Sequence, residues 1–476
     1  MWRSKKVLPD NPAVAAQTDA SEDVAVEHDA NKVHKQSIVF LQGPVGPFFS
    51  RVAKDFAKRG FEVHKINFNG GDKFFYNRAN TVDYADSPER WPEYLKIFIR
   101  RHAISRIYVF GDCRIYHQKA KEVADELGID YFVFEEGYIR PNYITLEKNG
   151  VNGYSSLMDR PALFGSTTQA DTPISAGSRY SFCISAFYSM LYYMAARSRQ
   201  HRFPHYEHHR PFGWLKEGAI WVRSGFRKVL NRQAGQKVTR ILDNRWQNQY
   251  FLCPLQVHCD MQVLVHSPYA SIDEFICEVM TSFAKNASKN HALVFKHHPY
   301  DRGYTNYSPL IEQLAKALHI DERTFYVHDV NLPNLIKNAD GCVMINSTVG
   351  MSSLYHKTPV KVMGNAVYDR KGLTYQGKLD NFWKKPGNVD ATAAAAFRAF
   401  LVRNNQLNGS LYRRCVKDSS AGVVWAGKLL AEHSPEANDK TSTQRFSGVR
   451  VIQGLHAASA NTVFKDPDDD ELSESA

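Results

Sequence analysis

The stretch that decides the fold is SIVFLQGPVGPFFSRVAKDFAKRGFEVHKINFN, residues 37–69. Residues 37–41 and 61–68 are rich in β-branched and aromatic side chains, which is typical of strands. Between them lies the turn GPVGP, after which apolar residues from Phe48 to Phe56 recur at the spacing of a helix face. A strand, a helix and a second strand in this order predict a βαβ unit. We therefore expect a parallel sheet with helices on its faces.

The same alternation of strands and helices continues along the chain in two series. The second series is expected to begin near residue 254, with a strand at QVLVHS (262–267), and to end with helices near 390–404 and 409–432. Two facing Rossmann-like domains of this kind predict an α/β fold of GT-B type, in which ligands bind at the carboxyl ends of the strands. The predicted division is a flexible leader (1–36), an N-terminal α/β domain (37–155), a basic aromatic helical insert (156–250), a C-terminal α/β domain (251–433) and a flexible tail (434–476).

The composition is that of a globular protein with an excess of positive charge. A chain of 476 residues is too long for one ordinary core. The net charge of +11 favours an anionic partner, such as a nucleic acid, a membrane surface or a phosphorylated substrate. Residues 151–250 hold 14 Lys and Arg against 5 Asp and Glu, with aromatic residues interleaved, and we expect two or more amphipathic helices there.

Several classes of protein are disfavoured by what the sequence lacks. The seven cysteines form no CxxC pair, which indicates reduced thiols rather than a disulfide framework or a zinc site. The N-terminal residues contain no apolar segment of signal-peptide length, and no run reaches the roughly 18 apolar residues of a membrane span. We therefore expect a cytoplasmic protein, which can still bind to a membrane surface.

Two adjacent acids close the apolar strand in YFVFEEGYIRP, residues 131–141. A buried carboxylate at the carboxyl end of a strand can serve as a general base, and a correctly placed one as a nucleophile. Alternation along the strand should turn Glu135 and Glu136 to opposite faces. The alternative is a pair that caps a helix or forms salt bridges.

A second strand end carries histidine and lysine in VFKHHP, residues 294–299. A histidine such as His298 can donate a hydrogen bond to a phosphate or protonate a leaving group, and Lys296 adds positive charge. A single His-Pro pair is common in proteins. The motif gains weight because the predicted fold sets it opposite the two glutamates.

A hydroxyl-rich turn leads from a strand into a helix in MINSTVGMSS, residues 344–353. Ser347 and Thr348 can place hydroxyls and backbone N–H groups at a helix N-terminus, which is a good phosphate site. An ordinary serine or threonine N-cap explains the same residues equally well.

Two further segments are weaker candidates. Gly43 and Gly46, in LQGPVGPFF, let a ligand approach the backbone, or simply form a tight turn between strand and helix. Gln256, in PLQVHCDMQ, can line a sugar pocket, although polar residues in such positions are more often structural.

Taken together, these segments resemble the bacterial capsule polysaccharide synthesis family, and within it the KpsS/LipB-type β-Kdo transferases. The resemblance spans residues 38–385. It rests on six stretches, FLQGPVGPFFSRVA, FEEGYIRPNYITLE, CPLQVHCDMQ, FKHHPYDRG, INSTVGMSSL and YDRKGLTYQGKLDNFW.

The resemblance implies a GT-B-like enzyme that transfers Kdo from CMP-β-Kdo to a phosphatidylglycerol-type lipid through a β linkage. The paired acids and the His-Pro motif of related bacterial sialyltransferases match Glu135–Glu136–Gly137 and His298–Pro299, and their phosphate-gripping hydroxyls match Ser347 and Thr348. A β donor that gives a β product means retention, whereas the sialyltransferases invert. Retention suggests either a carboxylate nucleophile or a front-face route, so whether the acid acts as nucleophile or as base stays open. The implied donor side also includes Lys296, Asn346 and Gln256, whereas Gly43, Gly46 and Arg140 are assigned to the acceptor side or to a loop.

The resemblance also suggests partners. No metal is expected for transfer, because histidine, hydroxyls and a helix N-terminus would neutralise the departing CMP. The basic aromatic insert suits anionic lipid head groups on the inner face of the inner membrane, or a capsule synthesis or export complex. A nucleic-acid partner is not expected, because no recognition motif accompanies the charge. The alternatives are a glycerophosphotransferase with a CDP-linked donor and a non-catalytic export or scaffold protein.

Overall fold

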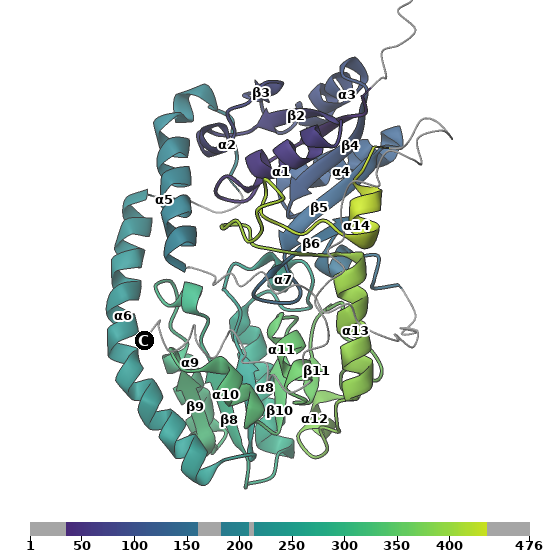
Figure 1. Ribbon diagram of the computed structural model, residues 1–476. Coiled ribbons are helices and arrows are strands. Elements are labelled where there is room, and N and C mark those ends of the chain that lie inside the picture. Colours follow the sequence, from purple (N-terminus) through teal and green to yellow (C-terminus); the bar gives the residue numbers. More distant parts are fainter. Residues whose placement is uncertain (1–34, 160–181, 209–213, 436–476) are drawn as a thin grey trace, which may run out of the picture. The chain divides into compact units, whose positions relative to one another are not determined.

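The computed structural model describes residues 35–159, 182–208 and 214–435 (Figure 1). Residues 1–34 and 436–476, which hold nearly all of the predicted leader and tail, lie outside the described residues. The predicted α/β class is confirmed, because the described chain forms two sheets of parallel or mainly parallel strands with helices packed against them.

The first sheet has seven strands in the order β12-β6-β5-β4-β1-β2-β3. Strands β1 to β5 are parallel to one another, whereas β6 and β12 run antiparallel to their neighbours. The elements of this half are β1 (Ser37–Phe40), α1 (Phe48–Lys58), β2 (Glu62–Asn67), α2 (Gly70–Phe75), β3 (Thr81–Asp83), α3 (Trp91–Arg101), β4 (Ile104–Phe110), α4 (Ile115–Leu127), β5 (Asp130–Glu136), β6 (Tyr143–Lys148) and η1 (Asn152–Tyr154).

Both faces of this sheet are covered, which explains why β1 carries consecutive buried apolar residues rather than an alternating pattern. In β1, Ile38 and Phe40 belong to the apolar cluster on the α1 face. Val39 belongs to the cluster on the other face, together with Trp91 of α3 and Tyr116 of α4. The βαβ unit predicted from residues 37–69 is therefore present, with β1 and β2 paired in parallel.

The second sheet has five parallel strands in the order β11-β10-β7-β8-β9. Its half consists of β7 (Tyr250–Pro254), α7 (Met261–Leu264), α8 (Ile272–Asn286), β8 (Ala292–Lys296), η3 (Pro299–Asp301), α9 (Ser308–Ala317), η4 (Asp321–Arg323), β9 (Thr324–Val327), α10 (Leu332–Lys337), β10 (Gly341–Met344), α11 (Val349–Tyr355), β11 (Val360–Val362) and α12 (Leu379–Phe382).

The first strand of this half lies earlier in the chain than predicted. The expected strand at 262–267 is wrong, because residues 261–264 form the short helix α7. The Asp260 side chain accepts a hydrogen bond from the backbone N–H of Gln262 and so starts this helix. The strand is instead β7, a short run of five buried residues.

Two helices of the basic insert are described, as the sequence predicts: α5 (Phe182–Ser198) and α6 (Trp214–Arg245), with the short η2 (Gln200–Arg202) after α5. Helix α5 packs on the first half, where the Tyr192 hydroxyl accepts a hydrogen bond from Gln42 and donates one to Asp72. Helix α6 lies along the second half, close to β9 (Figure 1). Among the described residues, no helix is both long enough and apolar enough to cross a bilayer.

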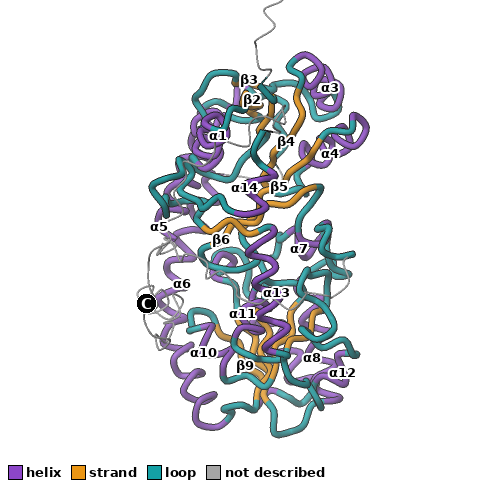
Figure 2. Tube along the Cα trace, turned by 45° about the vertical axis from the view of Figure 1, so that its right-hand side comes forward, coloured by secondary structure: helices purple, strands orange, loops and turns teal. Residues whose placement is uncertain are grey.

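The chain returns to the first sheet after α13 (Ala391–Asn404), as Figure 2 shows. Strand β12 (Gln406–Asn408) pairs with β6, and α14 (Gly427–Glu432) follows. The Asp55 carboxylate of α1 accepts hydrogen bonds from the backbone N–H groups of Ser420 and Ala421. Residues 406–433 thus pack on the first half, although the sequence assigns them to the second. A helix over 409–432 is also wrong, since only its last turns are helical.

Candidate functional site

The two glutamates lie in β5 itself, each paired with a residue of β6. Glu135 Oε1 accepts a hydrogen bond from the backbone N–H of Glu136 at 2.9 Å. The Glu136 carboxylate forms an ion pair with Arg140 at 2.7 Å. Gly137 is required next to them, because a Cβ there would lie 2.4 Å from the Tyr143 carbonyl oxygen. The ion pair that the sequence left as an alternative therefore exists for Glu136.

The pKa of Glu135 is raised above the usual value of a glutamate. Burial raises the pKa of Glu135 to about 8, and the carboxylates of Glu136 and Asp112 add to this effect. The residue therefore exchanges a proton near neutral pH, which is what acid–base catalysis requires.

His298 follows β8 and faces the same region as Arg140. Its Nδ1 accepts a hydrogen bond from the backbone N–H of Tyr300 at 3.2 Å. The neutral ring therefore carries its proton on Nε2, which is free of this bond and can donate. Burial, together with the positive charges of Lys296 and Arg140, lowers the pKa of His298 to about 3. Arg140 thus links the glutamates of the first half electrostatically to the histidine of the second.

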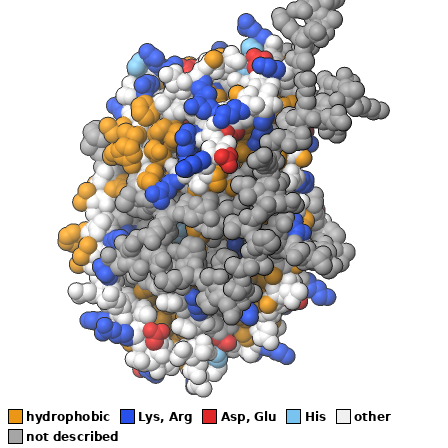
Figure 3. All heavy atoms as spheres, viewed as in Figure 1, with side chains coloured by type: hydrophobic (Ala, Val, Ile, Leu, Met, Phe, Trp, Pro, Cys, Tyr) orange, Lys and Arg blue, Asp and Glu red, His pale blue; other side chains and the backbone are white. Residues whose placement is uncertain are grey.

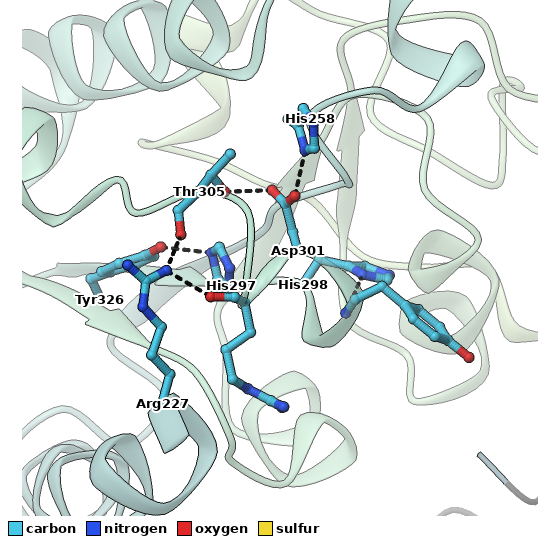
Figure 4. A network of polar contacts seen from close by, with 9 residues as sticks. Arg227, His258, His297, His298, Asp301, Thr305 and Tyr326 are labelled. Atoms are coloured by element: carbon cyan, nitrogen blue, oxygen red, sulfur yellow. Dashed lines mark hydrogen bonds and ion pairs between the residues drawn. The ribbon is translucent and has the colours of Figure 1, made fainter. Parts of the chain in front are cut away.

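A histidine–aspartate pair beside His298 was not predicted from the sequence (Figure 4). His258 Nδ1 lies 2.5 Å from Asp301, which is 1% exposed and also accepts a hydrogen bond from the Thr305 hydroxyl. Arg227 of α6 donates to the carbonyl oxygens of Thr305 and Arg302 and so holds this loop. The aspartate that follows HHPY was the available signal, but its partner lies 43 residues away in sequence.

The side chains of Asn346 and Gln256 form hydrogen bonds with each other and do not line an open pocket. Gln256 Nε2 donates to Asn346 Oδ1 at 3.0 Å, and the backbone N–H of Asn346 donates to Gln256 Oε1. Asn346 Nδ2 donates to the carbonyl oxygens of Gln262 and His266. Both side chains are buried. Their hydrogen bonds connect the segment that follows β10 to the segment that follows β7.

Ser347 and Thr348 precede α11, as predicted. The Ser347 hydroxyl accepts a hydrogen bond from the backbone N–H of Val349 at 3.2 Å, which forms a local turn just before the helix and not an N-cap. Thr348 makes no side-chain cap.

The remaining predicted residues divide between core and turn. Lys296 is buried, and burial lowers its pKa to about 8. In the GPVGP turn, the ring of Phe49 lies where a Cβ of Gly43 would project, and the ring of Tyr188 where that of Gly46 would. These contacts are those of a packed turn. A hollow of about 500 Å³ near β11 contains none of the predicted site residues.

One group of side chains in the described part of the chain could hold a metal ion. Asp112, Cys113 and His266 place one ligand atom each within 4.8 Å of one another. Cys113, Cys253, Cys277, Cys342 and Cys415 form no disulfide.

Comparison with known proteins identifies the family of the chain. The model of the family described as capsule polysaccharide biosynthesis protein matches residues 105–412, which include the ends of β5, β8 and β10. The chain belongs to this family. The predicted resemblance is therefore confirmed, and the protein takes part in capsule polysaccharide biosynthesis or modification.

Two relatives that are similar in sequence agree with this assignment. The capsule polysaccharide export protein KpsS of Escherichia coli is 41% identical over 374 residues, covering 79% of this chain and 96% of its own length. The capsule polysaccharide modification protein LipB of Neisseria meningitidis serogroup B is 37% identical over 388 residues, covering 79% and 92%. Among solved structures, the β-Kdo 2,7 transferase of Thermosulfurimonas dismutans KpsC aligns over 76% of this chain and 89% of its own, with 15% identity and a TM-score of 0.38.

Proposed function

We propose that this protein is a β-Kdo glycosyltransferase that transfers Kdo from CMP-β-Kdo to a phosphatidylglycerol-type lipid and so starts the capsule linker. The observation that carries the proposal is the pairing of two motifs across the two halves. Glu136 is held by Arg140, and Arg140 acts electrostatically on His298. Arg140 thus interacts with both Glu136 and His298, which supports a shared site where the carboxylates would act on the sugar and His298 on the donor phosphate.

The donor side stabilises the departing CMP. His298 offers its Nε2–H to a phosphate oxygen, because Nδ1 is engaged by the Tyr300 backbone. The hydroxyls of Ser347 and Thr348 stand before α11 and add hydrogen-bond donors. A bound phosphate raises the proton affinity of a neighbouring imidazole, so His298 can also transfer a proton to the leaving group. These groups supply the neutralisation without a metal in the transfer step.

The acid side acts on the sugar and on the acceptor. Retention is explained by two displacements. First, the Glu136 carboxylate forms a bond to the anomeric carbon while the bond to the CMP phosphate oxygen breaks. Then the acceptor hydroxyl attacks the same carbon, releases Glu136 and gives its proton to Glu135. Glu135 suits the second role because its pKa is about 8, close to the operating pH.

The acceptor side is supported by the surface of α5 and α6. Val222, Phe226, Val229 and Leu230 are exposed at the spacing of one helix face, the first two at 76% and 70%. Arg223 is exposed beside them. Figure 3 shows hydrophobic side chains over α5 and along α6, with lysine and arginine nearby. An apolar stripe with basic neighbours suits insertion between anionic lipid head groups, so the protein binds peripherally to the membrane.

The test is a mass-spectrometric transfer assay with CMP-Kdo generated in place and a fluorescent phosphatidylglycerol analogue. Glu135→Gln, Glu136→Gln and His298→Asn are compared with Glu312→Gln, an exposed glutamate of α9. We expect a product heavier by one or more Kdo units, lost in the three site variants and retained in the control.

Each alternative gives a different result. Transfer from CDP-glycerol instead of CMP-Kdo would replace the proposal by a glycerophosphotransferase. No transfer from either donor, with normal capsule in cells that carry Glu136→Gln, would assign a scaffold role. Sedimentation with phosphatidylglycerol or phosphatidylcholine vesicles tests the membrane surface, where Phe226→Asp should reduce binding to the anionic vesicles.

A further inference from the structure

We propose that Asp112, Cys113 and His266 form a binding site for a single Zn(II) ion that clasps the two halves of the chain together. The proposal concerns residues outside the proposed transfer chemistry. Asp112 and Cys113 follow β4 in the first half, and His266 follows α7 in the second. The site therefore differs from the expectation, drawn from cysteine spacing, that the chain has no zinc site.

The distances between the three ligand atoms are compatible with zinc coordination. The Cys113 sulfur lies 3.7 Å from His266 Nε2 and 3.3 Å from Asp112 Oδ1. In a tetrahedral site with Zn–S of about 2.3 Å and Zn–N or Zn–O of about 2.0 Å, sulfur and its neighbouring ligand atoms are roughly 3.5 Å apart. The sulfur thus already lies at suitable distances from both other ligand atoms, and all three atoms lie within 4.8 Å of one another.

Neighbouring groups hold two of the ligands in place. Asp112 Oδ2 accepts a hydrogen bond from the backbone N–H of Val151 at 2.9 Å, which leaves Oδ1 directed at the sulfur. The His266 ring packs edge-to-face on Tyr154 at 4.6 Å, and a Cβ on Gly153 would lie 2.3 Å from its Nδ1. Such second-sphere contacts fix ligand orientation in metal proteins.

The surrounding charge also favours a cation. Besides Asp112, the carboxylate of Asp260 acts electrostatically on Cys113. A thiol, an imidazole and a carboxylate match Zn(II), whereas Mg(II) and Ca(II) prefer sites made of oxygen ligands only. Three protein ligands would leave the fourth position of a tetrahedral site to water.

The role that follows from this placement is structural. The ion would connect the end of β4 to the segment after α7. That segment is already tied to β10, because Asn346 donates to the His266 carbonyl oxygen. Zinc would therefore set the distance between the strand ends that carry the glutamates and the donor-binding residues.

The test uses the untagged full-length protein, stripped with a chelator and kept under a thiol-free reductant. We expect one equivalent of Zn(II) by elemental analysis, and a Co(II)-substituted form with a thiolate charge-transfer band in the near ultraviolet. X-ray absorption of the zinc form should show one sulfur neighbour. Cys113→Ser should abolish the band and weaken Zn(II) binding by more than about 100-fold, since even the loss of a second-sphere partner costs about 10–100-fold.

The matched control is Cys415→Ser, which changes a free thiol outside this cluster and should keep full binding. Gly153→Ala should weaken binding by displacing the His266 ring. Sub-stoichiometric zinc in the native protein, or an absorption spectrum without sulfur, would overturn the proposal whether or not the variants fold. Retention of the charge-transfer band in Cys113→Ser would overturn it as well.

Discussion

Replacing Glu147 by glutamine should increase the free energy of unfolding, and this increase should become larger as the pH rises. Glu147 lies in β6, is buried, and accepts hydrogen bonds from the Ser155 hydroxyl and from Asn405 Nδ2. Burial raises its pKa from about 4.5 to about 7, against the opposing effect of these hydrogen bonds. The folded protein therefore holds a proton that the unfolded chain releases between these two pH values.

The sign and size follow from proton linkage. A carboxyl group with a raised pKa carries no penalty in acid, and folding becomes less favourable as pH rises from about 4.5 to about 7. At about 1.36 kcal/mol for each pH unit, the cost is about 1.4 kcal/mol at pH 5.5 and about 3.4 kcal/mol at pH 8.5. Glutamine can keep both hydrogen bonds, because its oxygen accepts from Asn405 and its nitrogen donates to Ser155.

The assay is urea unfolding of native protein and Glu147→Gln at pH 5.5, 7 and 8.5. We expect the stability of the variant relative to the native protein to rise by about 2 kcal/mol across this range. Glu322→Gln, an exposed glutamate, reports the general effect of removing a negative charge. A difference in stability that is the same at all three pH values would refute the reasoning, because it would mean that Glu147 does not take up a proton on folding.

Three further perturbations test the packing around the site. Asp55→Asn should lower the free energy of unfolding by about 2 kcal/mol at pH 7 and by less in acid, since hydrogen bonds outweigh burial and lower the pKa of Asp55 in the folded protein; urea unfolding measures both. Tyr192→Phe should cost about 1–3 kcal/mol and speed amide hydrogen exchange in α5, because it leaves buried partners of the hydroxyl unpaired. Gly137→Ala should lower both the melting temperature and transfer activity through its clash with the Tyr143 carbonyl, and unchanged values of both would contradict this.

The local parts of the fold could be predicted from the sequence, whereas the distant pairings could not. The spacing of Phe48, Val52 and Phe56 is visible within one helix and identifies α1 directly. By contrast, β12 is only three residues long and is a strand because β6 supplies its partner. No local pattern distinguishes such a segment from a loop.

The same physical reason separates the predicted from the unpredicted site residues. Glu135, Glu136 and His298 lie where buried strands end, so alternation and strand length point to them. Gln256 and Asn346 were predicted to bind ligand because each is a polar residue with no partner nearby in the sequence. Their hydrogen bonds join segments that are 90 positions apart, and no local pattern shows such a pairing. His258 was overlooked for the converse reason, since its partner Asp301 is remote in sequence.

The position of β12 near the end of the chain has a consequence for folding during translation. During synthesis on the ribosome, β6 emerges with one edge unpaired, and it stays so until the chain from Lys148 to Gln406 has followed. An unpaired edge strand is a template for pairing with other chains. The nascent first half should therefore depend on chaperones until its last strand is released, and premature termination before Gln406 should yield aggregates rather than a shortened soluble protein.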